Sequence, residues 1–267
     1  MNSGSRAAWV ALGLVAFGTG ASGRGHSTAP ATPGISVRYP EGTVHGFLEL
    51  TTADGTLLGH GDLLQVVNND EVSSRMVFHL ATGSVFEESV SFTQQGVFTM
   101  QSYHLVQSGP AFGDDIDAEL SHSGKYVVHA RSHKNGVGHD YSGTLSMPGD
   151  VYNGMEATVA KNISTRQSTS MHVVAFTPEP RMVDVVFAPT GTQRVSLGTH
   201  EETAVDFTVK PQLGAVMNVL AKLTRQLPPE THVWIITDDV PAFARSAGPM
   251  YTGPVWRIAL ASPQWPK

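Results

Sequence analysis

Apolar and polar residues alternate along most of the chain between residues 35 and 147, with almost no helical periodicity. The clearest example is Val72–Pro110, where three extended segments are separated only by Thr82-Gly83 and Gln95-Gly96. Alternation with a period of two is typical of strands that bury one face, and short glycine-containing breaks are typical of turns. This stretch therefore predicts the centre of an antiparallel β-meander.

The alternation also assigns side chains to the two faces of these strands. In the second segment, apolar and polar residues separate as Phe86, Val90 and Phe92 against Glu87, Ser89 and Ser91. In the third segment, the same rule separates Phe98, Met100, His104 and Val106 from Thr99, Gln101 and Tyr103. Glu87 and Glu88 are adjacent, so they point to opposite faces and cannot pair with each other as catalytic carboxylates. If one of them faces a dry concave surface, its pKa is expected to rise.

Strand-like segments continue before and after this meander. They are His45–Leu50, Leu57–Val67, Ile116–Leu120, Tyr126–His129, a segment from Gly138 to about Met147, Met171–Thr177, Arg181–Ala188, Arg194–Leu197, Ala204–Val209, Val233–Ile236 and Val255–Leu260. Helical spacing predicts one helix over Asp150–Ile163, with Asp150 as its N-cap, and another over Leu213–Leu223 after Pro211. The predicted fold is mainly β: a curved antiparallel meander, forming a half-barrel or incomplete barrel, with two packed helices.

The N-terminus has the pattern of a secretory signal peptide. Arg6 is the one charge before the apolar run Ala7–Phe17, and small residues follow up to Ser22. The run is shorter than the roughly 20 residues that span a bilayer, so a cleaved signal over residues 1–22 is favoured over a membrane anchor or a buried N-terminal helix. Residues 23–34 are rich in Ser, Thr, Ala, Pro and Gly and predict a flexible leader. Residues 35–267 contain no linker-like break, so we expect one β-rich domain.

Composition narrows the compartment and the partners. The chain has no cysteine, which excludes disulfides and the lipidated cysteine of a bacterial lipoprotein. No segment of the mature chain is apolar enough to cross a membrane, so we expect a periplasmic or extracellular protein. The formal net charge of -6, without a basic stripe, argues against nucleic acid as a partner. The sequence does not predict an oligomeric state or the exact signal cleavage site.

Residues that could carry chemistry do not form a recognised motif. His122, His129, His133 and His139 lie close in sequence, but in a strand-and-turn context they do not share the helical face of a zinc-binding pair. Asp114, Asp115 and Asp117 lack the glycine and the distal glutamate of a helix–loop–helix calcium loop. Gly-x-Ser-x-Gly, His-Glu-x-x-His and phosphate-binding glycine motifs are absent from the sequence. No catalytic residue, metal or cofactor is therefore predicted.

The segment from Leu227 to Leu260 is more distinctive, because aromatic residues gather there among prolines and glycines. Such segments form a pocket wall or pack their own aromatic rings against a sheet end. With the meander as floor, the candidate ligand-binding residues are Phe78, Phe92, Phe98, Met100, Trp234, Phe243, Tyr251 and Trp256. A half-barrel lined in this way can enclose a small ligand. The predicted function is a non-enzymatic periplasmic binding or carrier protein for an apolar, lipid-like molecule.

Two stretches resemble a family of uncharacterised secreted proteins from soil and related bacteria. The first contains SSRMVFHLATGSVFEESVSF and HLVQSGPAF, and the second contains LPPETHVWI, PAF, GPMY and PVWRIAL. The resemblance covers most of the mature chain and implies no activity, so no catalytic residue is transferred. This chain departs from the family at Ala247, where an acidic residue is expected. In architecture alone, the meander with interposed helices looks like the LolA/LolB half-barrel carriers.

Two other functions remain open at the level of sequence. A hydrolase of envelope material would require Glu88, His104 or a nearby aspartate to converge in one cleft with a shifted pKa. A structural or interaction module of the cell envelope would show an exposed apolar patch or a free sheet edge and no cavity.

Overall fold

The computed structural model divides the chain into two compact units, Met1–Ala31 and Thr32–Lys267. It describes residues 34–176, 179–197, 200–212, 230–238, 240–250 and 253–261, all in the second unit. The predicted signal peptide (residues 1–22), nearly all of the leader (residues 23–34) and the predicted helix Leu213–Leu223 lie outside the described residues.

The described residues form fourteen strands and one helix. The strands are β1 (Val44–Thr52), β2 (Leu57–Asn68), β3 (Glu71–Leu80), β4 (Val85–Gln95), β5 (Val97–Ser108), β6 (Asp114–Ser121), β7 (Lys125–Ser132), β8 (Gly138–Thr144), β9 (Thr169–Ala175), β10 (Arg181–Leu197), β11 (His200–Pro211), β12 (Thr231–Ile236), β13 (Ala242–Pro249) and β14 (Val255–Leu260). The helix is α1 (Glu156–Asn162). No helix among the described residues is long and apolar enough to span a membrane.

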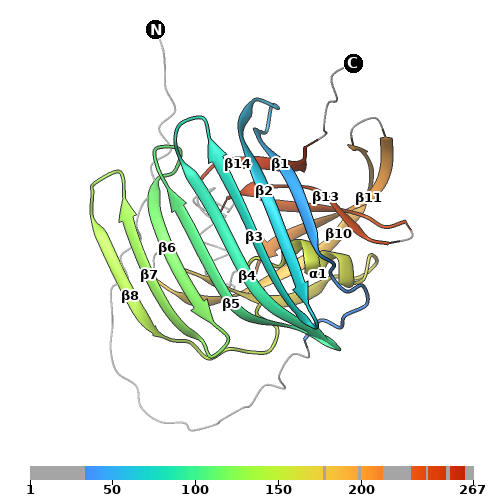
Figure 1. Ribbon diagram of the computed structural model, residues 1–267, viewed down its shortest axis with the longest axis horizontal. Helices are drawn as coiled ribbons and strands as arrows, with labels where there is room; N and C mark the ends of the chain where they lie inside the picture. The colour runs from blue at the N-terminus through green and yellow to red at the C-terminus, as the bar shows by residue number, and fades with distance from the viewer. Residues whose placement is uncertain are drawn as a thin grey trace. The chain divides into compact units, whose positions relative to one another are not determined.

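All fourteen strands belong to one antiparallel sheet (Figure 1). Its order is β8-β7-β6-β5-β4-β3-β2-β1-β14-β13-β12-β11-β10-β9. The first and last strands pair in its middle, with Leu48 opposite Leu260 and Thr52 opposite Trp256. The outermost strands, β8 and β9, are not joined to each other, so the sheet is not closed. The prediction of a mainly β, antiparallel, incompletely closed fold is confirmed.

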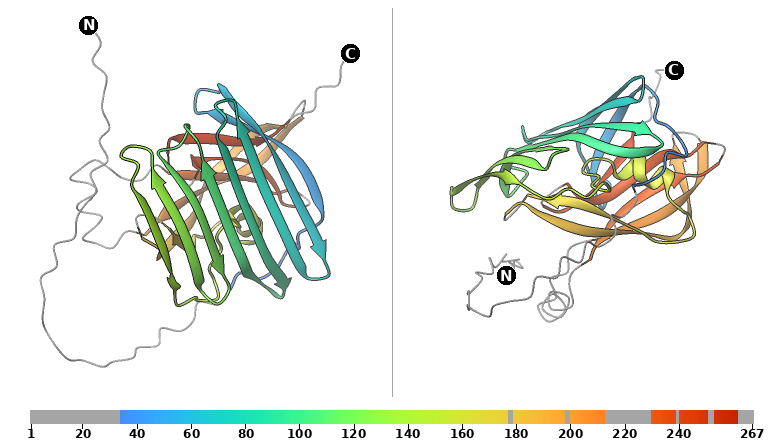
Figure 2. Two further views of the ribbon diagram at one scale, coloured as in Figure 1. Left: turned by 60° about the vertical axis from the view of Figure 1, so that its left-hand side comes forward. Right: turned by 90° about the horizontal axis from the view of Figure 1, so that it is seen from below.

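We call β1–β8 the first half of the sheet and β9–β14 the second half. The two halves share one core on the inner face, which we define as the face that carries the main apolar cluster. Phe112 from the first half lies 5.7 Å from Trp256 of β14, and Tyr103 of β5 stacks on Phe176 at 5.9 Å. Figure 2 shows α1 between the two layers of strands. The opposite face is called the outer face below. Each strand alternates between these two faces because its side chains have a period of two.

A bulge in β5 corrects the predicted face of His104 and Val106. Opposite β4, the register shifts between Ser91/Ser102 and Phe92/Met100, which leaves Gln101 as the extra residue. An extra residue exchanges the two faces for every side chain beyond it. Phe98 and Met100 are therefore buried as predicted, but beyond the bulge Tyr103 is buried instead of His104. The prediction for Thr99 and the other residues before the bulge needs no change.

Three other elements differ from the prediction. The first helix is shorter than Asp150–Ile163, because it begins at Glu156 and Met155 occupies the N-cap position without a side-chain cap. Asp150 instead pairs with His172, at 2.8 Å. The two strands predicted around residue 190 are one strand, β10, with an irregularity between Pro189 and Gly191. Strand β13 was not predicted at all, since its sequence lacks clear alternation and contains Gly248.

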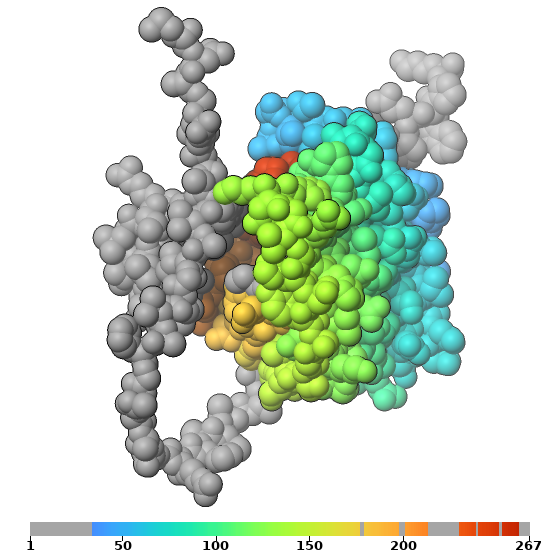
Figure 3. All heavy atoms as spheres, turned by 90° about the vertical axis from the view of Figure 1, so that its left-hand side faces the viewer, coloured from blue at the N-terminus to red at the C-terminus, as the bar shows by residue number. Residues whose placement is uncertain are grey.

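The outer face of the second half has a small apolar cluster of its own. It is made of Val195, Ala204, Trp234, Ile236 and Ala244. These side chains are at most 8% exposed. The outer face of the first half is different, because its strands present polar and charged residues, and the edge strand β8 is mostly exposed. Figure 3 views the molecule from that edge.

Candidate functional site

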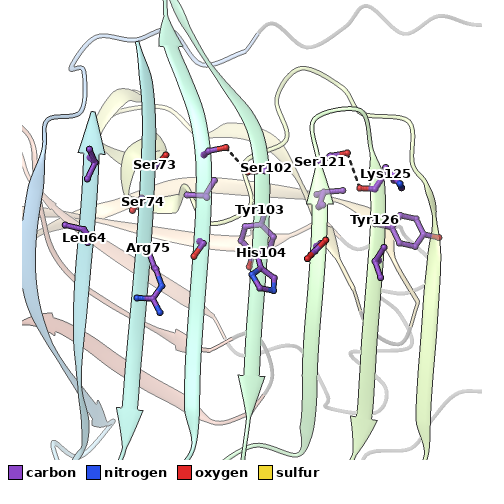
Figure 4. A pocket seen from close by; sticks show the side chains of 17 residues that line it. Leu64, Ser73, Ser74, Arg75, Ser102, Tyr103, His104, Ser121, Lys125 and Tyr126 are labelled. Carbon is purple, nitrogen blue, oxygen red and sulfur yellow. Dashed lines mark hydrogen bonds between the residues drawn. The ribbon is translucent and has the colours of Figure 1, made fainter. Parts of the chain in front are cut away.

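A groove of about 590 Å³ crosses the outer face of the first half, from β2 to β7. Short side chains form its floor. In the strand register, Ser73 is opposite Ser91, Ser91 is opposite Ser102, and Ser102 is opposite Ser121. Because neighbouring strands lie about 4.8 Å apart, these residues make a row of hydroxyl groups across four strands. Figure 4 shows Ser73, Ser102 and Ser121 at one level of the sheet.

Some hydroxyl groups of this row already form a hydrogen bond with another serine. Ser91 Oγ lies 2.7 Å from Ser102 Oγ, and Ser121 Oγ lies 2.9 Å from Ser123 Oγ. A hydroxyl donates one hydrogen bond and has two lone pairs for accepting others. A serine that bonds to one neighbour therefore keeps capacity for a ligand. Long charged side chains at the same places would have filled the groove.

Larger residues form the walls of the groove. Leu64 and Val66 of β2 lie at one end and are 48% and 45% exposed, and Lys125 of β7 lies at the other end. Lys125 forms no ion pair within the described part of the chain. In the next row of the sheet, Arg75 of β3 and His104 of β5 lie on either side of Ser89 of β4, and Figure 4 shows both at one level of the sheet. The groove therefore offers apolar contact at one end and hydrogen bonds and positive charge elsewhere.

One ion pair and one histidine–aspartate contact fix the side chains of Arg75 and His104. Arg75 donates to both carboxylate oxygens of Glu87, at 2.6 and 2.8 Å, and His104 Nε2 lies 2.9 Å from Asp117 Oδ1. The hydrogen bonds from Arg75 hold the pKa of Glu87 below its usual value, and the same contact raises the pKa of Arg75. A bidentate pair of this kind restricts both side chains. The Arg75–Glu87 pair is thus held in place before a ligand binds, although both side chains are partly exposed.

The inner face carries a second group of functional side chains, beside α1. Tyr103 donates from its hydroxyl to Glu88 Oε1, at 2.6 Å. Burial raises the pKa of Glu88, as the sequence predicted for a glutamate on a dry concave face. Glu156 opens α1, and burial together with the charge of Glu88 raises its pKa to about 8. Near neutral pH at least one of the two carboxyl groups is therefore protonated.

Gly154 allows this inner group to assemble. Its φ of +70° lies in the left-handed region, which glycine adopts at little cost. A Cβ atom there would lie 2.9 Å from Cε2 of Tyr103 and 3.4 Å from Cδ of Glu88. The backbone at Gly154 thus lies closer to Tyr103 and Glu88 than a residue with a side chain would allow.

A third arrangement lies where β9 meets β10. His172 bridges two carboxylates, with Nδ1 2.8 Å from Asp150 and Nε2 3.0 Å from Asp184. These residues line a hollow of about 180 Å³ together with Ser170 and Gln212. The backbone of His172 also exchanges hydrogen bonds with Asp150 and Tyr152. Because both ring nitrogens are engaged, His172 acts as a clamp that fixes the chain before α1 to β9.

Histidine–aspartate pairs are frequent across the sheet. His129 and His133, two of the histidines that are close in sequence, pair with Asp140 and Asp115, and these hydrogen bonds raise the pKa of each imidazole. His122 instead contacts the Met100 carbonyl, at 2.9 Å. Within the described ranges, no three His, Cys, Asp or Glu side chains are grouped as metal ligands.

The predicted ligand-binding residues fall into separate places. Six of them join the main inner cluster: Phe78, Phe92, Phe98, Met100, Phe243 and Trp256. Trp234 belongs to the outer cluster of the second half. Tyr251 lies outside the described residues. None of the other seven, which lie in the described part of the chain, lines the groove, and the role of all eight in binding stays a prediction.

The residues predicted for a hydrolase do not converge. Glu88 lies opposite Leu105 and points inward, whereas His104 lies opposite Ser89 and points outward. The groove residues were missed although the sequence contained a signal for them. The polar positions of the meander are mainly serine, at 73, 89, 91 and 102, where exposed strands usually carry longer side chains.

Comparison with known proteins adds little to this geometry. No protein-family model and no curated protein matches the chain. Among solved structures, a beta-barrel-like protein of a domain of unknown function, DUF1849, from Brucella abortus is similar, with 12% identity and a TM-score of 0.44. The match covers 84% of this chain and 98% of that one. That neighbour belongs to a domain of unknown function. The family expected from the sequence and the likeness to LolA and LolB stay predictions. At this TM-score the match carries no argument about function.

Proposed function

We propose that this protein is an exported binding protein that holds an extended amphiphilic ligand in the groove across β2–β7, without catalysing a reaction. The observation that carries the proposal is the groove itself, at about 590 Å³. Ligand sites typically have about 300–1,000 Å³. A site built on six hydrogen-bonded strands changes little on binding, so little affinity is lost to ordering.

The lining defines the chemistry of the ligand. Leu64 and Val66 present apolar surface at one end, and the serine row presents donors and acceptors across the middle. A ligand with an apolar segment and a hydroxylated or charged segment would match both the apolar end and the serine row. This refines the lipid-like ligand predicted from the sequence by giving it a polar part.

The outer groove is a better candidate than the packed interior. Phe78, Phe92, Phe98 and Met100 are at most 3% exposed. A ligand could contact these side chains only by displacing their packing, which costs several kcal/mol for each large residue. The groove needs no such rearrangement. Export is part of the proposal because of the charged and apolar pattern of residues 1–22.

An interaction module of the envelope is the alternative, and one side chain favours it. Phe47 of β1 is 61% exposed on the outer face, where it lies opposite Asp62 and diagonal to Leu64 of β2. Exposed apolar residues that lie together mark contact surfaces for proteins or membranes. The experiment below separates the two functions, because a contact surface does not require an open groove.

Native mass spectrometry of the protein purified from membrane-containing cells tests the proposal. We expect a co-purifying amphiphile on the wild-type protein and its loss from Ser91→Trp and Ser102→Trp, since an indole fills the groove. Ser196→Trp, at an exposed site on β10, is the matched control and should keep the ligand. An empty wild-type protein, or a ligand that persists in both groove variants, would contradict the proposal.

A further inference from the structure

The outer face of the second half carries a stack of three side chains whose hydrogen bonding is incomplete. The His232 ring stacks on Trp234 at 5.3 Å, and the Arg245 guanidinium lies 4.4 Å from the centre of the Trp234 ring. Trp234 and Arg245 are opposite each other in the register of β12 and β13. Strand pairing thus places an indole N–H and a guanidinium on one small area of the sheet.

The acceptors beside this stack are used by other donors. Asp206, which is 5% exposed, accepts from His232 Nδ1 at 2.9 Å and from Gln193 Nε2 at 3.3 Å. The side-chain carbonyl of Gln193 in turn accepts from Arg245 Nη2, at 3.1 Å. Asp206 therefore balances part of the charge of Arg245 without bonding to it directly.

Two donors at the centre of the stack have no acceptor. Trp234 Nε1 and Arg245 Nε are both buried, and neither has a hydrogen-bond partner. Trp234 as a whole is 8% exposed. An unsatisfied buried donor is costly, and a native protein that retains one requires an explanation such as a missing water or ion. The Arg245 guanidinium packs over the Trp234 ring, so both unsatisfied donors belong to one stack.

The charges around these donors have the same sign. Arg257 of β14 lies opposite Ala247, two residues along from Arg245, so both arginines are on the outer face. Burial, and then the charge of Arg257, lowers the pKa of Arg245. The neighbouring Ala204, Ile236 and Ala244 are apolar and buried, and charged hydrogen bonds are stronger in such surroundings.

We propose that Trp234, Arg245 and Arg257 form a binding site for a phosphate group, either inorganic phosphate or the phosphate of an anionic lipid headgroup. A phosphate has several acceptor oxygens, so it can accept from the indole and from both guanidinium groups at once. Arginine is the residue best suited to this contact, because its planar fork donates two parallel bonds. The bound anion supplies the missing acceptor and offsets the repulsion between the arginines.

This site is separate from the groove. It lies on β12–β14, whereas the groove lies on β2–β7. Phosphate binding here therefore stands or fails independently of the amphiphile proposed for the groove. Trp234 was among the ligand-binding residues predicted from the sequence, and the structure gives it a specific polar function through Nε1.

Isothermal titration calorimetry of the full chain with inorganic phosphate is the first test. We expect measurable binding to the wild-type protein and about tenfold or greater weakening in Trp234→Phe and Arg245→Gln, since each loses a bond to a charged group. Arg194→Gln is the control, because Arg194 is exposed, pairs with Glu201, and lies on the opposite face of β10 from Gln193 and Val195. It removes the same charge and should leave binding unchanged.

Trp234→Phe also separates binding from a purely structural role. It keeps an aromatic ring under Arg245 and removes the unsatisfied indole N–H. In phosphate-free buffer this variant should unfold at a temperature no lower than the wild type, and added phosphate should stabilise it less. A variant that is less stable without phosphate, yet gains as much from phosphate as the wild type, would overturn the proposal.

Vesicle sedimentation distinguishes the two sources of the phosphate. Vesicles of phosphatidylcholine, with and without phosphatidylglycerol, are compared for the wild type, Arg245→Gln and Arg194→Gln. Binding that needs phosphatidylglycerol and Arg245 assigns the site to a lipid headgroup, whereas calorimetric binding alone assigns it to soluble phosphate. If neither ligand binds, or if Arg245→Gln and Arg194→Gln lose equal affinity, the site does not exist as proposed.

Discussion

Glu87 and Glu88 are neighbours in the chain, yet the sheet gives them opposite properties. Glu87 points outward, where two hydrogen bonds from Arg75 hold its pKa below the usual value. Glu88 points inward, where burial raises its pKa and the hydroxyl of Tyr103 offsets only part of that rise. The face of the strand, and not the type of residue, decides the charge.

The same contrast extends to the whole first half of the molecule. On its outer face, charged side chains pair across strands, as Arg75 does with Glu87. Its inner face is an apolar core interrupted by two carboxyl groups with raised pKa values, Glu88 and Glu156. The outer face thus tolerates changes of charge, whereas the inner face responds to volume and to protonation. Four experiments separate these two behaviours.

The largest effect is expected from a pair of adjacent substitutions on β4. Phe92→Ala removes a side chain that is 1% exposed in the inner core, and should lower the free energy of unfolding by about 3–5 kcal/mol. Ser91→Ala, one residue earlier and on the outer face, should change it by no more than about 0.5 kcal/mol. Denaturant unfolding measures both. Similar losses for the two variants would show that β4 does not divide the molecule in this way.

A second substitution acts on the close contact before α1. Gly154→Ala places a Cβ atom 2.9 Å from the Tyr103 ring at a positive φ, and should cost about 2–4 kcal/mol through backbone strain and overpacking. Gly96→Ala is the control, because Gly96 has a φ of +75° and no heavy atom within 4 Å of the added Cβ. The difference between the two variants isolates the clash. Equal costs would mean that strain alone acts at Gly154.

The pH dependence of stability follows from the inner pair. A carboxyl group with a raised folded-state pKa binds more protons in the folded protein than in the unfolded one, so its contribution is present at low pH and lost as pH rises. For Glu156 the loss runs from the ordinary value of 4.5 to about 8. Because both side chains keep some exposed surface, we expect a decrease of about 1–3 kcal/mol.

Denaturant unfolding at a series of pH values measures this loss, with Glu156→Gln as the test variant. Glutamine has the shape of a protonated glutamate and does not ionise, so the variant should be more stable than the wild type above the titration. If the free energy of unfolding still decreases with rising pH in both Glu156→Gln and Glu88→Gln, the decrease comes from other groups.

The smallest effect is expected at the outer pair. Glu87 has a lowered pKa, so its contribution is present above the ordinary value of 4.5 and is lost as pH falls through the folded-state pKa. Arg75 is 57% exposed, and Glu87→Gln should therefore cost less than about 1 kcal/mol near neutral pH. Added salt should reduce the cost. A double-mutant cycle of Glu87→Gln and Arg75→Gln measures the coupling energy between the two side chains. A value of several kcal/mol would contradict the distinction between the faces.

Much of the fold could be predicted because alternation is a local signal. The three central strands, β3–β5, follow directly from it, and so does the separation of Glu87 from Glu88. The faces of His104 and Val106 could not be predicted, because the bulge at Gln101 is set by pairing with β4. A single extra residue has no signature in a polar and apolar pattern.

The candidate sites show the same limit more strongly. The serine row is an alignment of residues from four strands, and only the register brings Ser73 and Ser121 into one groove. The stack of Trp234 on Arg245 joins β12 to β13, a strand without clear alternation. Glu156 was assigned to a helix correctly, but its partner on β4 is distant in sequence. Chemistry that depends on pairing between strands becomes visible only when the pairing is known.

The position of β14 has a consequence for how the molecule is made. It pairs with β1 in the middle of the sheet, with Leu48 opposite Leu260. During synthesis, one edge of β1 therefore stays unpaired until β14 has left the ribosome. Contacts of such long sequence separation form slowly and leave strands open to aggregation. The two halves of the sheet can thus be joined only after β14 has been made.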